Sequence, residues 1–106
     1  MKLDDVTVKC PDTGTDLKIV KAGEYNTGML ALAVIAKVTG EPWATITVNV
    51  NAHLPDSRCV TIKNYSENAN LVQPLLDTGI FEEMHQWISS GHVKVPIWRI
   101  KDEVML

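Results

Sequence analysis

Three histidines and two cysteines are the side chains of this sequence that bind transition metals most readily. The residues that would have to meet at one ion are His53, Cys59, His85 and His92. No two of them have the Cys-x-x-Cys or His-x₃-His spacing of a structural zinc site. They do not predict a Cys/His nucleophile either, because a cysteine within a strand, such as Cys59, is usually a small hydrophobic residue. We therefore expect no metal, no cofactor and no catalytic residue.

The segment "KNYSENANL", from Lys63 to Leu71, gathers polar side chains where a predicted strand passes into a predicted helix. A helix N-terminus has free N–H groups that can bind an anion, and Ser66 stands at its predicted cap. The same side chains can instead satisfy the backbone at a strand-to-helix corner. The sequence leaves both interpretations open. As a partner-binding surface, the segment would contribute Asn64, Tyr65, Ser66, Glu67 and Asn68.

Two of the three tryptophans lie on the less apolar face of predicted strands. Trp43 shares its face with threonine and asparagine, and Trp98 shares its face with histidine and lysine. An aromatic residue in such a place either packs against a covering helix or anchors a protein contact, since Trp is enriched at interface hot spots. We add Trp98 to the predicted partner-binding residues.

Length and composition predict a single globular domain over residues 1–106. Hydrophobic residues make up 45% of the chain and charged residues 22%, which is ordinary for a folded protein. Ten Lys and Arg against thirteen Asp and Glu give a net charge of -3, and neither sign is clustered. Direct nucleic-acid binding is therefore not expected, nor is strong nucleic-acid mimicry.

The distribution of apolar residues along the sequence predicts that the protein neither spans nor binds a membrane. The longest apolar run, Met29 to Ala36, is about half as long as a membrane-spanning helix. The start Met-Lys-Leu-Asp-Asp turns acidic before an apolar signal region can form. We expect a cytoplasmic protein in which Cys10 and Cys59 are reduced thiols.

The first half of the chain alternates apolar and polar residues, which is typical of strands. We expect a hairpin from Val6 to Val20, then a loop from Ala22 to Gly28. A strand from Leu30 to Val38 and, after a turn, a strand from Trp43 to Val50 should form a one-sided antiparallel ribbon. In the strand from Trp43 to Val50, Thr47 is expected on the wet or semi-exposed face. A helix from Met29 to Lys37 is the competing interpretation.

The second half is predicted to contain strands and short helices. A strand from Cys59 to Lys63 precedes a helix capped at Ser66, which Pro74 should loosen at its start and Gly79 should end. Phe81, Met84 and Ile88 would line a second short helix.

A final strand from Gly91 to Ile100 contains Pro96, which cannot donate a hydrogen bond and therefore indicates an edge strand. Residues Lys101 to Leu106 should form a partly ordered tail. These elements predict the α+β class, with an antiparallel sheet of about five or six strands and one or two short helices on one side.

Several segments resemble an uncharacterised bacterial family, domain of unknown function 4313, found in gut Firmicutes and their phages or integrative elements. The similar segments are "GMLALAV", "GEPWATITVNV", "KNYSENANL", "LLDTGI" and "SGHVKVPIWRI". The similarity covers most of the chain, roughly Gly28 to Ile100, and leaves out the N-terminal hairpin. The resemblance implies a setting and no assigned chemistry, because small proteins of mobile elements often bind a host or defence protein.

We therefore expect a small non-enzymatic protein-binding module, an inhibitor of a host defence system that acts by protein contact. The alternative is a small anionic-ligand or enzymatic role at the helix N-terminus near Ser66. A homo-oligomer formed through the edge strand that ends at Arg99 is a third expectation.

Overall fold

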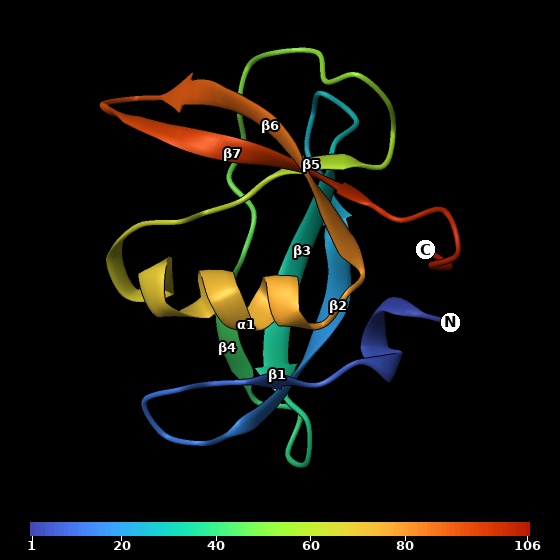
Figure 1. Cartoon of the computed structure of the whole chain (residues 1–106), viewed down its shortest axis with the longest axis vertical. Coiled ribbons are helices and arrows are strands. Elements are labelled where there is room, and N and C mark those ends of the chain that lie inside the picture. The colour runs from blue at the N-terminus through green and yellow to red at the C-terminus, as the bar shows by residue number, and fades with distance from the viewer.

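In the computed structural model, which describes residues 1–106, the chain forms two antiparallel sheets (Figure 1). The first has the strand order β1-β2-β3-β4 and contains β1 (Val8–Lys9), β2 (Asp16–Glu24), β3 (Leu30–Ala36) and β4 (Pro42–Thr45). The second has the order β5-β7-β6 and contains β5 (Cys59–Thr61), β6 (Phe81–Ser90) and β7 (Val93–Ile100). The 3₁₀ turn η1 (Leu3–Asp5) precedes β1, and η2 (Ser66–Leu71) with α1 (Val72–Asp77) joins β5 to β6. The α+β class is confirmed, although the strands divide into two sheets.

Alternating side chains build the inner face of the first sheet. The buried positions in β2 and β3 are Leu17, Ile19, Leu30, Leu32, Val34 and Ala36. The residues between them are only partly covered or exposed, as expected for a sheet packed on one face. The predicted hairpin and the strand from Leu30 are confirmed. The loop begins later than expected, because a bulge between Lys21 and Gly23 lets β2 continue to Glu24.

The chain passes from the first sheet to the second at Ile46. The N–H of Ile46 donates to the carbonyl of Leu32 in β3 (3.0 Å), and its carbonyl accepts the N–H of Lys63 just after β5 (2.8 Å). The alternation predicted from Trp43 to Val50 breaks here, so that Ile46 and its neighbour Thr47 are both buried. Only the first part of that predicted strand forms β4.

Thr47 is buried, and the prediction that it lies on a wet face is wrong. The residue is 2% exposed. Its hydroxyl accepts the N–H of Leu32 (3.1 Å) and is hydrogen-bonded to the hydroxyl of Tyr25 (3.1 Å). The Thr47 side chain therefore supplies the acceptor that a backbone N–H of β3 needs where β4 diverges from it.

Pro74 determines where the α-helix begins. Proline has no N–H, which is tolerated in the first turn of an α-helix because that group has no partner within the helix. The segment before this turn is the 3₁₀ helix η2, so the expected loose start is confirmed. Leu71 and Leu75 are buried, and α1 crosses in front of the first sheet (Figure 1). Gly79, with a φ of 78°, follows the helix end as predicted.

Residues after α1 form a strand, and the predicted second helix is wrong. β6 pairs with β7 on both sides of a bulge, from Phe81 opposite Ile100 to Ser90 opposite Val93. The register shifts between Glu83 and Gln86, which is a bulge in β6. The helix-like spacing of the apolar residues was misleading, because they face opposite sides of this strand.

β7 is the central strand of its sheet, so the prediction that Pro96 marks an edge is wrong. The carbonyl of Pro96 accepts the N–H of Ile62, which follows β5 (3.1 Å). In an antiparallel ladder the N–H and C=O of one residue point to the same neighbour. Because Pro96 has no N–H, the ladder loses one hydrogen bond on the β5 side of β7 and none on the β6 side. The exposed edge of this sheet is β6, not the strand that ends at Arg99.

A cluster of 19 buried side chains joins the two sheets. It includes Leu32 from the first sheet, Trp98 and Ile100 from the second, and Leu75 from α1. Val104, near the C-terminus, belongs to the same cluster and is 1% exposed, so the predicted partly ordered tail is wrong. None of the helices is both long enough and apolar enough to span a membrane.

Candidate functional site

The polar segment predicted as a contact surface is only partly exposed. Ser66 and Glu67 are exposed, whereas Asn64 and Tyr65 are half-buried. The cap position of η2 is Tyr65, and no side chain caps the helix there. Ser66 has a φ of 55°, in the left-handed region. The prediction that Ser66 is the N-cap is therefore wrong.

Asn68 holds the polar segment against the first sheet. The residue is 1% exposed, and its side-chain amide donates to the carbonyl of Thr45 at the end of β4 (2.6 Å). Its backbone N–H donates to the carbonyl of Tyr65 (3.1 Å). A residue so enclosed cannot contact a partner, so the inclusion of Asn68 in the predicted surface is corrected.

The charges of the polar segment are paired within it. The Lys63 ammonium lies 3.3 Å from the Glu67 carboxylate and 5.5 Å from the centre of the Tyr65 ring. The pKa of Glu67 is lowered first by a hydrogen bond from its own backbone N–H and then by Lys63. An anion arriving here would meet this carboxylate, and no hollow is lined by Ser66. The geometry therefore does not favour the anionic-ligand alternative.

Trp98 is a core residue, so its inclusion among the predicted partner-binding residues is corrected. It is 1% exposed, and its ring centre lies 5.4 Å from that of Phe81. The two rings are tilted by 50°, a favourable arrangement for aromatic pairs. The sequence pattern places Trp98 on the polar side of β7 correctly, but the body of the protein covers that side at this point.

The projecting part of the β6–β7 hairpin carries the most exposed tryptophan. Trp87 is 59% exposed and faces Pro96 across the ladder. The turn of the hairpin lies at the periphery of the molecule, away from α1 (Figure 1). Trp87 was missed in the sequence because the segment was assigned to a helix. Trp87 lies outside the apolar stripe that Phe81, Met84 and Ile88 would form on such a helix, and this mismatch is the signal that the sequence offers.

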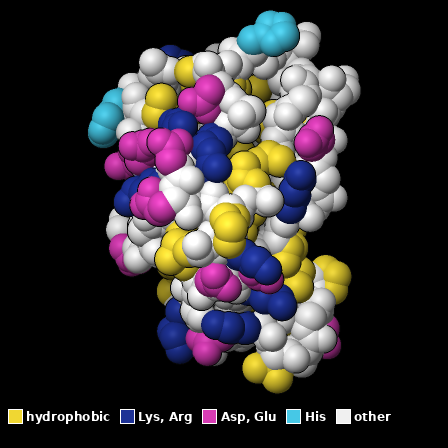
Figure 2. Space-filling view, turned by 90° about the vertical axis from the view of Figure 1, so that its right-hand side faces the viewer, with side chains coloured by type: hydrophobic (Ala, Val, Ile, Leu, Met, Phe, Trp, Pro, Cys, Tyr) yellow, Lys and Arg dark blue, Asp and Glu magenta, His cyan; other side chains and the backbone are white.

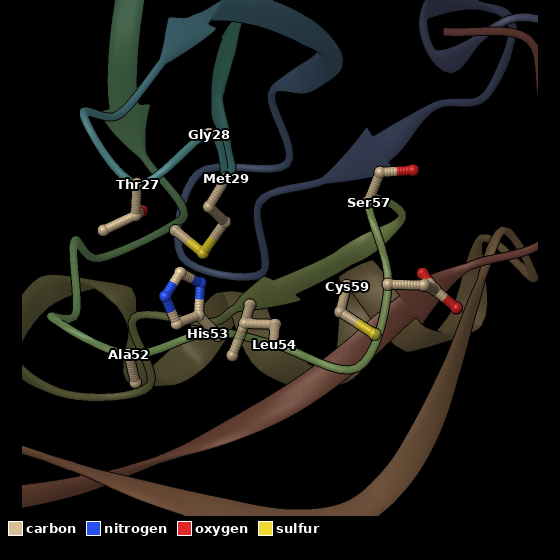
Figure 3. A pocket seen from close by; sticks show the side chains of 9 residues that line it. Thr27, Gly28, Met29, Ala52, His53, Leu54, Ser57 and Cys59 are labelled. Atoms are coloured by element: carbon tan, nitrogen blue, oxygen red, sulfur yellow. The ribbon is translucent and has the colours of Figure 1, made fainter.

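A hollow of about 290 Å³ contains two of the four candidate metal ligands (Figure 3). His53 and Cys59 both line it, but the Cys59 side chain lies well apart from the His53 ring. His85 and His92 do not line this hollow. No three His, Cys, Asp or Glu side chains lie close enough together to hold a metal ion. The four residues therefore do not converge.

Asp56, the acidic residue that lines this hollow, is already paired with other groups of the protein. The Asp56 carboxylate contacts the Arg99 guanidinium (2.8 Å) and accepts the N–H of Arg58 (2.8 Å). Arg99 also contacts Asp102 (2.7 Å) and Glu82 (3.3 Å). The pKa of its guanidinium is raised, first by the hydrogen bond to Asp56 and then by the one to Asp102. The Arg99 side chain thus ties the loop before β5 to β6 and to the C-terminal segment.

Both cysteines are free and buried, Cys10 being 5% and Cys59 1% exposed. Burial raises the pKa of the Cys59 thiol, although the hydrogen bond that it shares with the backbone near Asp56 opposes the shift. The thiol is therefore protonated at neutral pH. Such a group is a poor nucleophile, because the thiolate is the reactive form.

Acid should weaken the fold through Asp56. The pKa of Asp56 is lowered chiefly by its bond from Arg99 and next by the Arg58 N–H, so the ionised form is favoured in the folded state. This stabilisation is fully present above the unfolded pKa of about 3.9 and is lost as the pH falls through the lower, folded value. We expect Asp56→Asn to flatten the fall in unfolding free energy below about pH 5, measured by urea denaturation at stepped pH.

The control for this prediction is Glu103→Gln, which removes an exposed carboxyl that is in no ion pair. The unfolding free energy of Glu103→Gln should depend on pH in the same way as that of the native protein. Equal curves for Asp56→Asn and the native chain would show that the Asp56–Arg99 pair contributes nothing in solution.

A wider, apolar hollow of about 500 Å³ lies between the two chain ends and β2. Its walls include Leu3, Ile19, Val20, Met105 and Leu106. The space-filling view of this side of the molecule shows hydrophobic side chains interspersed with basic and acidic ones (Figure 2). Neither sign of charge dominates the face in this view.

No family model, no curated protein and no solved structure matches this chain. The resemblance to domain of unknown function 4313 therefore stays a prediction.

Proposed function

We propose that this chain is a non-enzymatic protein-binding module that contacts its partner through the projecting β6–β7 hairpin. The observation that carries the proposal is the 59% exposure of Trp87 on an edge strand. Tryptophan is the residue type most enriched at the energetic centre of protein interfaces.

The edge of β6 supports the same interpretation. β6 runs from Phe81 to Ser90 and is bonded to a neighbour only on the β7 side. Its free edge presents backbone N–H and C=O groups that can pair with an extended segment of another protein. The part after the bulge, Gln86 to Ser90, has neither Lys nor Pro to discourage such pairing. A partner segment added here would lie directly beside Trp87.

The acid and the thiol that line the 290 Å³ hollow support a binding role more than a catalytic one. Asp56 is held by Arg99, and the Cys59 thiol stays protonated. Neither group has the free, activated character that general acid–base or nucleophilic catalysis needs.

For the partner, we propose a host or defence-system protein that the chain inhibits by occupying its surface. This part of the proposal comes from the resemblance to proteins of phages and mobile elements. The exposed ring and free strand edge are suited to such contact, since they need no prior rearrangement of the core.

Replacing Trp87 by alanine is expected to reduce capture of the partner from lysate of the natural host by at least about ten-fold. The unfolding free energy should change by less than about 0.5 kcal/mol, because the ring is mostly in water. The matched control is Trp43→Ala, which removes the other exposed tryptophan (41% exposed) and should leave capture unchanged. Quantitative mass spectrometry of the retained proteins measures both.

The same variants distinguish a second copy of the chain from a foreign partner. Light scattering on the purified protein will show a dimer, lost in Trp87→Ala, if β6 pairs with itself. The proposal is overturned if the native chain retains no specific protein at micromolar concentration and is monomeric. It is equally overturned if Trp43→Ala and Trp87→Ala reduce capture to the same extent.

A further inference from the structure

A small hollow of about 40 Å³ lies beside the bulge of β6. Its lining residues include Glu83, His85, Trp87, Pro96 and Trp98. This volume is enough for about three water molecules, and thus for the end of one long side chain. It is the only one of the four hollows that lies on the projecting hairpin.

The strand register brings the walls of this hollow together. Trp87 lies opposite Pro96, and Glu83 lies opposite Trp98. Partners across a ladder face the same side of a sheet, and so do residues two apart on β7. Pro96 and Trp98 are buried and form the floor, while Glu83 and Trp87 are exposed and form the walls.

The bulge creates the gap between the two walls. It inserts Met84 and His85 between the row that contains Glu83 and the row that contains Gln86, and Trp87 follows in the next row. His85 has a φ of 55°, a conformation that is costly for a residue other than glycine. Bulges and such backbone strain occur preferentially where they direct a side chain toward a binding site.

The charge of the hollow is unpaired. Glu83 takes part in no ion pair, whereas the adjacent Glu82 contacts Arg99 (3.3 Å). The ring of Trp87 likewise has no cation over it. Glu83 and Trp87 line the same hollow, and a carboxylate together with an indole suits a guanidinium, because this planar cation can stack on the ring and donate hydrogen bonds to the acid.

We propose that this hollow receives one arginine side chain of the protein partner, held between the Glu83 carboxylate and the Trp87 ring. The inference deepens the proposed function and depends on it, since it names the partner chemistry at the same hairpin. An extended partner segment paired to the edge of β6 would place alternate side chains on this face of the hairpin.

The test uses N-acetylarginine amide as the probe and the three indole N–H resonances of the full chain as the readout. Trp87→Phe assigns the resonance of Trp87. At constant ionic strength we expect this resonance to shift with the probe, and to shift far less with the neutral isostere N-acetylcitrulline amide. Glu83→Gln should raise the dissociation constant about three- to five-fold.

Glu82→Gln is the matched control, because it makes the same chemical change at the neighbouring residue, whose carboxylate contacts Arg99. It should leave the dissociation constant for the probe unchanged. The proposal is overturned if the Trp87 resonance does not move, if citrulline moves it equally, or if both glutamine variants weaken binding alike. Because no partner protein is present, such a failure would leave the Trp87→Ala capture result standing.

Discussion

Replacing Trp98 by alanine is expected to lower the free energy of unfolding by about 3–5 kcal/mol. The residue is 1% exposed and belongs to the cluster that joins the two sheets, so the deleted ring leaves a cavity at their junction. Its contact with Phe81 is lost as well. A loss of this size removes a large part of the total stability of a domain of 106 residues. Urea or thermal denaturation followed by circular dichroism measures it.

Trp98→Phe is the control, because it retains an aromatic ring in contact with Phe81 while removing part of the volume. It should cost clearly less than alanine. The opposite pattern is the one expected for a surface anchor: a stable Trp98→Ala variant that loses its partner. That result would contradict the core position described above.

Thr47→Val should lower the unfolding free energy by about 1–3 kcal/mol, although valine has almost the same shape. The substitution removes the hydroxyl that accepts the N–H of Leu32 and bonds to Tyr25. A buried donor is then left without a partner, and water does not replace it at a residue only 2% exposed. Hydrogen exchange should accelerate at the Leu32 amide in particular, which NMR can follow.

The matched control is Thr45→Val, two residues earlier on an exposed position of β4. Valine suits a strand at least as well as threonine does, so the change should stay within about 0.5 kcal/mol. Equal effects at positions 45 and 47 would mean that the corner at Ile46 does not form as described.

Two-residue periodicity was enough to predict the strands of the first sheet. In β2 and β3 the apolar face is buried on the core, and each local preference agrees with the fold. The same periodicity was insufficient after Thr45, because the strand there changes its pairing partner. The acceptor for the Ile46 N–H lies in β3, whereas the donor to its carbonyl follows β5. Such a change depends on contacts distant in sequence, which local alternation does not record.

The errors at the candidate site have a related cause. The bulge in β6 obscured the strand pattern, so Trp87 was assigned to a helix and its exposure was not predicted. For Trp98, the pattern gave the correct side of β7 but not which part of the protein covers it. For Pro96, residue type indicated an edge, whereas β7 is the central strand and the missing N–H costs a single bond where β5 has already ended. Coverage of a strand face is a tertiary property.

The two buried thiols allow local opening of the protein to be measured by alkylation. Cys10 directly follows β1 and Cys59 begins β5, so each sheet carries one alkylation target at its margin. A reagent reaches either sulfur only when the surrounding segment opens transiently. The relative speed of labelling at the two positions therefore reveals which half of the molecule loosens first.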